Sequence, residues 1–267
     1  MSIHESQPVL IYCVCVAAIF GAAMGSFLNC AAWRIAHKQS FLKGRSHCPS
    51  CGHNLSAIDL VPLFSWLLLR GKCRYCGAKV SVRYFLTELL MAAITVLCLL
   101  RFDLTVLCLR NYVFLCCLFC LSLVDLEDYT IPDGCLLISA AVWLIAQPLV
   151  GQGWKEALLR LLAAVVFGGG LLLLSLLMDR ILKKDSLGGG DIKLFFVVGL
   201  YLGFASTLFS LLLACVLGLL FAFLRRKSGN EEGEQIPFGP SIAAAAAVML
   251  LFGDPMVRWY LGLISAA

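Results

Sequence analysis

Long runs of apolar residues follow one another with few breaks after residue 83. About 20 apolar residues are needed for a helix to cross a bilayer, and backbone inside lipid must satisfy its own hydrogen bonds. With 61% hydrophobic and only 14% charged residues, the sequence predicts an all-α polytopic membrane protein. The first run has no basic region before it, which favours a retained membrane helix over a signal peptide.

About eight stretches are predicted to cross the membrane as helices. They cover residues 8–33, 84–100, 104–124, 134–150, 156–178, 192–204, 205–224 and 240–262. The sixth and seventh come from one stretch that as a single helix would be about 50 Å long, against a hydrocarbon core of about 30 Å. We therefore divide it near Gly203. The spacings Gly21-x-x-x-Gly25 and Gly199-x-x-x-Gly203 predict close helix packing.

The positions of Lys and Arg predict the orientation of these helices. Nine lie in residues 34–83, three in 179–190 and three in 225–227, and the eight-span arrangement puts all of them on one side. Basic loops are typical of the cytoplasmic side, so both termini are expected outside. A single helix over 192–224 would weaken this bias. The arrangement also brings Asp125 and Asp191 to the same membrane face.

The cysteines fall into two groups. Ten of the fourteen lie in or beside apolar segments, where cysteine behaves as a small hydrophobe. The others form two C-x-x-C pairs, Cys48, Cys51, Cys73 and Cys76, each followed by glycine. Two such pairs supply a tetrahedral four-sulfur site for structural zinc, and a cytoplasmic location disfavours the alternative of disulfides. His47 and His53 flank the first pair and are expected to be solvated.

Two carboxylates stand at predicted membrane boundaries. Asp191 follows three glycines and opens one apolar run, and Asp125 closes another. Two acids that share a proton can hydrolyse a peptide, since one activates water while the other polarises the carbonyl. Asp191 could instead cap a helix. Glu127 and Asp128 can be read as a solvated loop, and Asp133 as the N-cap of the fourth span.

Several motifs together resemble the bacterial prepilin peptidases, or type IV leader peptidases, which are GxGD aspartyl proteases. The motifs are Gly188-x-Gly190-Asp191-Ile192-Lys193-Leu194, Val124-Asp125-Leu126, Ile131-Pro132-Asp133, Gly25-Ser26-Phe27-Leu28-Asn29, the two C-x-x-C pairs, Arg70-Gly71-Lys72-Cys73, Arg83-Tyr84 with Glu88, and Pro237-Phe238-Gly239-Pro240. Their order along nearly the whole chain carries the resemblance. Ala36 and Phe85 stand where the family often has proline.

The resemblance implies an inner-membrane enzyme that removes the basic leader of type IV prepilins or pseudopilins at the cytoplasmic side and then methylates the new amino terminus. S-adenosylmethionine would be the methyl donor and zinc the structural metal. By position, Asp125 and Asp191 would be catalytic, Gly188, Gly190 and Lys193 would form the active-site loop, and Gly71, Lys72 and Glu88 would serve methylation.

The sequence thus predicts a first membrane helix at 1–33, a cytoplasmic zinc-binding domain at 34–83 and a membrane peptidase core at 84–267. No nucleic-acid partner is expected. Two other classes remain open. A secondary transporter would place paired acids near mid-membrane and carry an internal repeat, and neither is visible in the sequence. A zinc-stapled assembly protein would explain the cysteines and leave the Gly-Gly-Gly-Asp sequence without a role.

Overall fold

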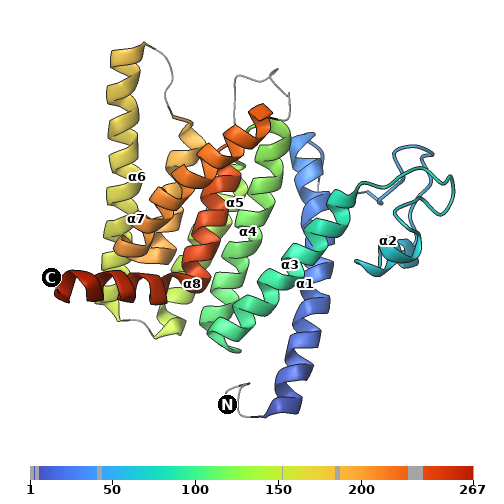
Figure 1. The fold of residues 1–267 in the computed structure, drawn as a ribbon, viewed down its shortest axis with the longest axis horizontal. Coiled ribbons are helices and arrows are strands. Elements are labelled where there is room, and N and C mark those ends of the chain that lie inside the picture. Colours follow the sequence, from blue (N-terminus) through green and yellow to red (C-terminus); the bar gives the residue numbers. More distant parts are fainter. Residues whose placement is uncertain are drawn as a thin grey trace. The chain divides into compact units, whose positions relative to one another are not determined.

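The computed structural model describes residues 3, 6–40, 44–151, 153–183, 187–227 and 237–266. Within these ranges the regular structure is helical, apart from two isolated bridges in the cysteine-rich segment. Among the described residues, seven helices are long and apolar enough to cross a membrane. They are α1 (Gln7–Ala36), α3 (Val82–Phe102), α4 (Val106–Asp128), α5 (Asp133–Val150), α6 (Trp154–Leu182), α7 (Gly189–Lys227) and α8 (Gly239–Ala266) (Figure 1).

The chain forms two compact units, Met1–Tyr112 and Val113–Ala267, whose boundary falls within α4. The three-part division predicted from the sequence places its boundaries elsewhere and stays a prediction. The sequence also predicts a flexible loop over 228–235, which is polar and contains glycine, and this stretch lies outside the described residues.

In the first unit, α1 packs against α3 through small residues. A Cβ on Gly25 would lie 2.9 Å from the Met91 Cβ and 3.0 Å from the Glu88 Cα, and Gly21 meets the Ala92 backbone in the same way. Backbones approach this closely only where side chains are absent. The packing role predicted for the Gly21-x-x-x-Gly25 spacing is therefore confirmed.

In the second unit, α7 packs against both α6 and α8 (Figure 1). Gly199 sits on the α6 backbone, where an added Cβ would be 2.6 Å from the Ala164 Cα. Tyr201 stacks on Phe114 with ring centroids 3.9 Å apart and donates its hydroxyl to the Ser139 carbonyl at 2.8 Å. These contacts bind the first half of α7 to α4, α5 and α6.

The long helix α7 is broken at Gly203, whose backbone is non-helical with φ 72° and ψ −175°. The arms 189–202 and 204–227 correspond to the sixth and seventh predicted spans, so the predicted division has a structural counterpart. Gly203 itself breaks the helix because glycine accepts positive φ. The second position of the Gly199-x-x-x-Gly203 spacing is thus a kink.

A kink inside lipid leaves backbone carbonyls without their usual helical donors. The Arg160 guanidinium of α6 replaces a missing donor by donating a hydrogen bond to the Tyr201 carbonyl. It also pairs with Glu156 at 3.1 Å. The Thr207 hydroxyl donates to the Gly203 carbonyl at 2.5 Å. The break in α7 is therefore hydrogen-bonded on both sides.

Replacing Arg160 by methionine should lower the free energy of unfolding by about 1–3 kcal/mol, because the Tyr201 carbonyl loses a charged donor in an apolar setting. Lys155→Met is the matched control, since Lys155 is exposed on the same helix. Denaturant titration of the helical signal in detergent measures the difference. Equal stability of the two variants would contradict this role for Arg160.

Candidate functional site

The four cysteines of the two C-x-x-C pairs meet at one point. All four sulfurs lie within 4.8 Å of one another, and the Cys48 and Cys76 sulfurs are 3.9 Å apart. Metal–sulfur bonds of about 2.3 Å in a tetrahedron place the sulfurs about 3.8 Å apart. The donor set and spacing therefore fit a metal ion held by four thiolates.

Each pair forms the same backbone turn. The N–H of Gly52 donates to the Cys48 carbonyl at 2.8 Å, and that of Gly77 donates to the Cys73 carbonyl at 3.0 Å. Both glycines have positive φ, 69° and 72°, which explains why glycine follows each pair. N–H groups of Cys51 and Ser50 directed at its sulfur lower the pKa of the Cys48 thiol to about 6. The turn thus favours the thiolate that a metal requires.

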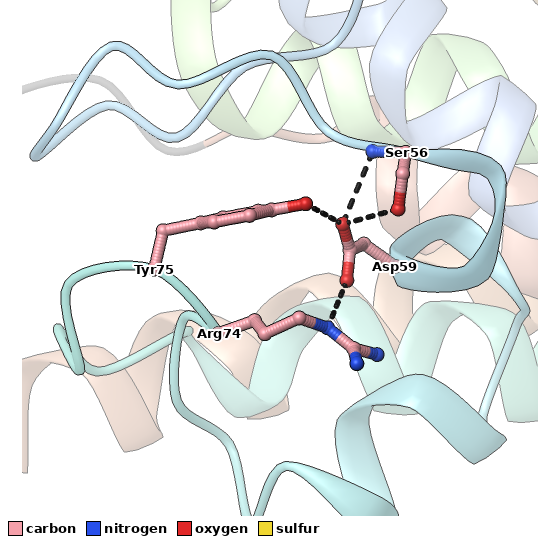
Figure 2. Close-up of polar contacts among 4 residues, drawn as sticks. All are labelled: Ser56, Asp59, Arg74 and Tyr75. Atoms are coloured by element: carbon pink, nitrogen blue, oxygen red, sulfur yellow. Dashed lines mark hydrogen bonds and ion pairs between the residues drawn. The ribbon is translucent and has the colours of Figure 1, made fainter.

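Asp59 ties the second cysteine turn to the segment before it (Figure 2). Its Oδ2 accepts hydrogen bonds from the Ser56 N–H at 3.1 Å, the Ser56 hydroxyl at 2.6 Å and the Tyr75 hydroxyl at 2.9 Å. Its Oδ1 pairs with the Arg74 Nε at 2.7 Å. The Ser56 hydroxyl and the other donors hold the pKa of Asp59 below its usual range. Such a carboxylate stabilises the fold above its unfolded pKa and loses that contribution only as the pH falls through the lower folded value.

Gly71 and Glu88, which the resemblance links to methylation, lie around the short helix α2 (Phe64–Leu68). Gly71 has φ 66°, and a Cβ there would be 2.8 Å from Trp66 Cζ2. The buried Glu88 carboxylate accepts from the Leu63 N–H at 2.7 Å. The structure thus brings Gly71 and Glu88 to the two ends of α2, whereas Lys72 is exposed.

Asp125 lies in the last turn of α4 and is only 4% exposed. Its Oδ2 accepts from the backbone N–H of Gly239, the first residue of α8, at 2.9 Å. An added Cβ on Gly239 would be 2.7 Å from that oxygen, so only glycine leaves room for the carboxylate. The positive end of a helix macrodipole therefore meets Asp125 directly.

Asp191 lies in the first turn of α7. Its N–H donates to the Gly188 carbonyl at 3.1 Å, and a Cβ on Gly188 would be 3.0 Å from its Oδ2. Gly190 meets Ile131, where an added Cβ would be 2.9 Å from the Ile131 Cβ. The absence of a side chain at Gly188 thus lets the Asp191 carboxyl lie over this residue. The absence of one at Gly190 lets the turn between α4 and α5 approach the start of α7. The first-turn position is also the one expected for a favourable helix dipole.

The two acids, 66 positions apart in the sequence, both lie beside the turn between α4 and α5. Asp125 is in the last turn of α4, and Gly190, the neighbour of Asp191, contacts Ile131 of that turn. The turn between α4 and α5 joins them structurally. Lys193 Nζ pairs with Asp133 Oδ1 at 2.8 Å, and Arg225 donates to the Tyr129 hydroxyl at 2.7 Å. Asp133 is the first residue of α5 and Pro132 the N-cap, so the predicted capping role of Asp133 is wrong by one position.

Sequence reasoning missed the role of Gly239. The available signal was a glycine between Phe238 and Pro240 at the start of an apolar run. No turn requires glycine at this position, and the structure shows that the reason is the close approach of Asp125. Phe238 helps to hold the start of α8 against α7. Its ring lies over Gly218, where an added Cβ would be 2.7 Å from the ring.

Fold and site together define a multi-pass membrane protein with two carboxylates at helix ends beside one turn and a separate four-cysteine cluster that could bind a metal. The bacterial peptidase A24 N-terminal domain matches residues 19–102, and the type IV leader peptidase family matches residues 112–223. The chain belongs to the type IV leader peptidase family.

Its relatives carry consistent names. The prepilin leader peptidase/N-methyltransferase of Bacillus subtilis (strain 168) is 31% identical, over 91% of this chain and 96% of the relative. The protein of the same name from Aeromonas salmonicida (strain A449) is 34% identical, over 82% of this chain and 75% of the relative. The type 4 prepilin-like proteins leader peptide-processing enzyme of Escherichia coli O78:H11 is 31% identical, over 85% of this chain and 90% of the relative. No solved structure matches the chain significantly.

Proposed function

We propose that this chain removes the basic leader from type IV prepilins or pseudopilins, with Asp125 and Asp191 as the catalytic pair, and then methylates the new amino terminus. The placement of these two acids at the ends of α4 and α7, beside the same turn, carries the proposal. Membership of the leader peptidase family and the names of the relatives support the reaction.

The mechanism uses water as the nucleophile. One carboxylate, ionised, takes a proton from water, whose oxygen attacks the scissile carbonyl while the protonated partner polarises the carbonyl oxygen. Collapse of the tetrahedral intermediate breaks the carbon–nitrogen bond, and the leaving amine receives a proton from the pair. No covalent link to the enzyme forms.

The loop at Gly188 and Gly190 presents Asp191 to the substrate. Without side chains there, an extended substrate backbone can lie against the acid. Lys193 acts as a positioning residue in this proposal, because its ion pair with Asp133 holds the start of α7 to the start of α5.

We assign the four-cysteine cluster to structural zinc in a cytoplasmic domain at residues 34–83, between the first helix and a membrane core at 84–267. Zinc prefers four thiolates in this spacing, and four protein ligands leave no open position for catalysis. Zinc would supply folding energy to the segment. The basic residues at 34–83 and 225–227 support a cytoplasmic placement of this domain and of the two acids in the inner membrane.

For the methyl transfer we propose S-adenosylmethionine as donor and Gly71, Lys72 and Glu88 as the participating residues. Gly71 and Glu88 contact α2 at Trp66 and Leu63, so both would act by positioning that helix. Lys72, being exposed, is free to meet an anionic group such as the donor's carboxylate.

Glu127 and Asp128 are expected to attract the basic leader. Reversing both charges to lysine should weaken leader-peptide binding about threefold to tenfold at low salt. Asp128 is exposed and Glu127 half-buried, and charges near the surface mainly steer and are easily screened. Fluorescence titration at low and high salt measures the effect. The affinity of the neutralised variant Glu127→Gln/Asp128→Asn should lie between those of the wild type and the charge-reversed variant. At high salt the affinities of all three proteins should become equal. Unchanged affinity at low salt would contradict the role.

Gly239→Ala should slow leader cleavage about 10²-fold, because the added Cβ displaces the Asp125 carboxylate and small misplacements of reacting groups are costly. Gly169→Ala is the control, since nothing lies within 4 Å of a Cβ there and its rate should match wild type. Initial rates on a prepilin peptide measure both. Equal rates for the two variants would show that the Gly239 contact does not position Asp125.

The function itself is tested by incubating purified protein with a prepilin peptide and S-adenosylmethionine and weighing the products by mass spectrometry. A peptidase and methyltransferase yields the leader and a methylated mature peptide. A transporter or a structural assembly protein leaves the peptide intact, which would overturn the proposal.

A further inference from the structure

The segment before the second cysteine turn exposes a row of apolar side chains. The exposed fractions are 67% for Ile58, 42% for Leu60, 43% for Val61, 64% for Phe64, 53% for Leu67 and 81% for Leu68. We call these six residues the docking face. Ile58 and Leu60 belong to the short 3₁₀ helix η2 (Ala57–Leu60), Val61 follows it as its C-cap, and the other three belong to α2 (Phe64–Leu68), which contacts η2. On α2 they follow the i, i+3, i+4 spacing of one helix face.

The opposite side of α2 is fastened to the first turns of α3. The Leu63 N–H donates to the Glu88 carboxylate at 2.7 Å, and the Trp66 and Phe85 rings are 5.2 Å apart. Glu88 lies about 9 Å along α3 from its first residue, Val82, at the helical rise per residue. The docking face is therefore level with the end of a helix long and apolar enough to cross a membrane, on which Leu86 and Leu89 are themselves exposed.

The charge around the docking face has one sign. Residues 57–80 contain four basic side chains and one acid, Asp59, which Arg74 already pairs. Arg70, Lys72 and Lys79 are exposed. Apolar side chains bordered by lysine and arginine are the pattern of segments that lie in a membrane interface, and basic groups there bind anionic lipid headgroups.

Asp59 fixes η2 in place by its contacts with Ser56 on one side and with Arg74 and Tyr75 on the other (Figure 2). Arg74 and Tyr75 are the two residues between Cys73 and Cys76. The metal-binding turn thus holds the first part of the docking face.

We propose that the docking face inserts into the interfacial layer of the bilayer that α3 spans, with Arg70 and Lys79 on anionic headgroups. The cysteine segment then lies on the membrane surface as a fixed element, with η2 held by Asp59 and α2 by Glu88. Continuity with the lipid-exposed side of α3 selects a bilayer as the occupant over a protein partner.

Photo-crosslinking of the full chain in nanodiscs tests the proposal. p-Benzoylphenylalanine replaces Phe64, Leu68 or Ile58 in separate proteins, in discs of phosphatidylcholine with or without phosphatidylglycerol. Position 89 on α3 is the lipid-exposed reference, and position 54, exposed on the first cysteine turn, is the matched control. Peptide mass spectrometry reads lipid adducts at each position.

Lipid adducts at positions 64 and 68 should exceed those at position 54 by at least about fivefold and increase further with phosphatidylglycerol. Adding Asp59→Ala should lower the adduct at position 58 at least about threefold and leave position 68 unchanged, because only η2 is released. Yields at 64 and 68 equal to position 54, or adducts to a second copy or another polypeptide in place of lipid, would overturn the proposal. An unchanged adduct at position 58 would overturn the role of Asp59.

Discussion

Replacing Cys48 and Cys73 together by serine is expected to remove the metal and unfold residues 44–80 while the membrane helices stay folded. Within 44–80 the buried residues are Cys48, Gly71 and Cys73 alone, so this segment has no apolar core of its own. Four-thiolate zinc sites contribute on the order of 10–16 kcal/mol of binding free energy, which exceeds the stability of a typical small domain. Hydrogen exchange of the full chain, with metal content measured in parallel, should show near-complete loss of amide protection over this segment.

A matched cysteine control separates metal loss from general damage. Cys215→Ser changes an exposed cysteine of α7 and should retain both the metal and the protection. Removing metal from the wild-type protein with a chelator should reproduce the double-serine result. Protection over 44–80 that survives in the metal-free protein would contradict a metal-dependent fold.

Asp125→Asn or Asp191→Asn should slow leader cleavage at least about 10³-fold, since each removes one half of a proton-sharing pair. Asparagine keeps the size of the side chain, and its amide oxygen can still accept from the Gly239 N–H, so the variants should remain folded. Initial rates on a prepilin peptide measure the loss, with helical content and metal content as checks of the fold.

Asp128→Asn is the control for this pair of variants. Asp128 belongs to the same turn of α4, yet it is exposed and its carboxylate accepts from the nearby Thr130 hydroxyl at 3.1 Å. At saturating peptide, where its expected part in attracting the leader no longer limits the rate, the Asp128→Asn rate should stay within about twofold of wild type, as expected of a surface substitution. A loss as large as that of Asp125→Asn would mean that the acidic turn as a whole, rather than one buried acid, governs the rate.

The membrane helices and the metal cluster could be predicted because their signals are local. An apolar run of sufficient length has few alternatives to a spanning helix, and two C-x-x-C pairs with following glycines carry both the ligands and the turn. The break at Gly203 was also predictable, because a single helix would have been too long for the bilayer.

The contacts between distant residues could not be predicted in the same way. The Gly239 N–H and the Asp125 carboxylate are 114 positions apart, and the Arg160 guanidinium meets the Tyr201 carbonyl across 41. Both contacts depend on which helix faces pack together. The hydrophobic pattern of the sequence does not identify these faces when every face of a membrane helix is apolar. The Asp59 contacts likewise join a separate turn to the second cysteine pair.

The most direct test of the paired acids compares Asp125→Asn, Asp191→Asn and the double variant in single-turnover cleavage with enzyme in excess. If the two carboxylates act as one unit, the double variant should be as slow as the slower single variant, within about threefold. Losses that multiply in the double variant would contradict a shared mechanism. So would either single variant that keeps more than about a tenth of the wild-type rate.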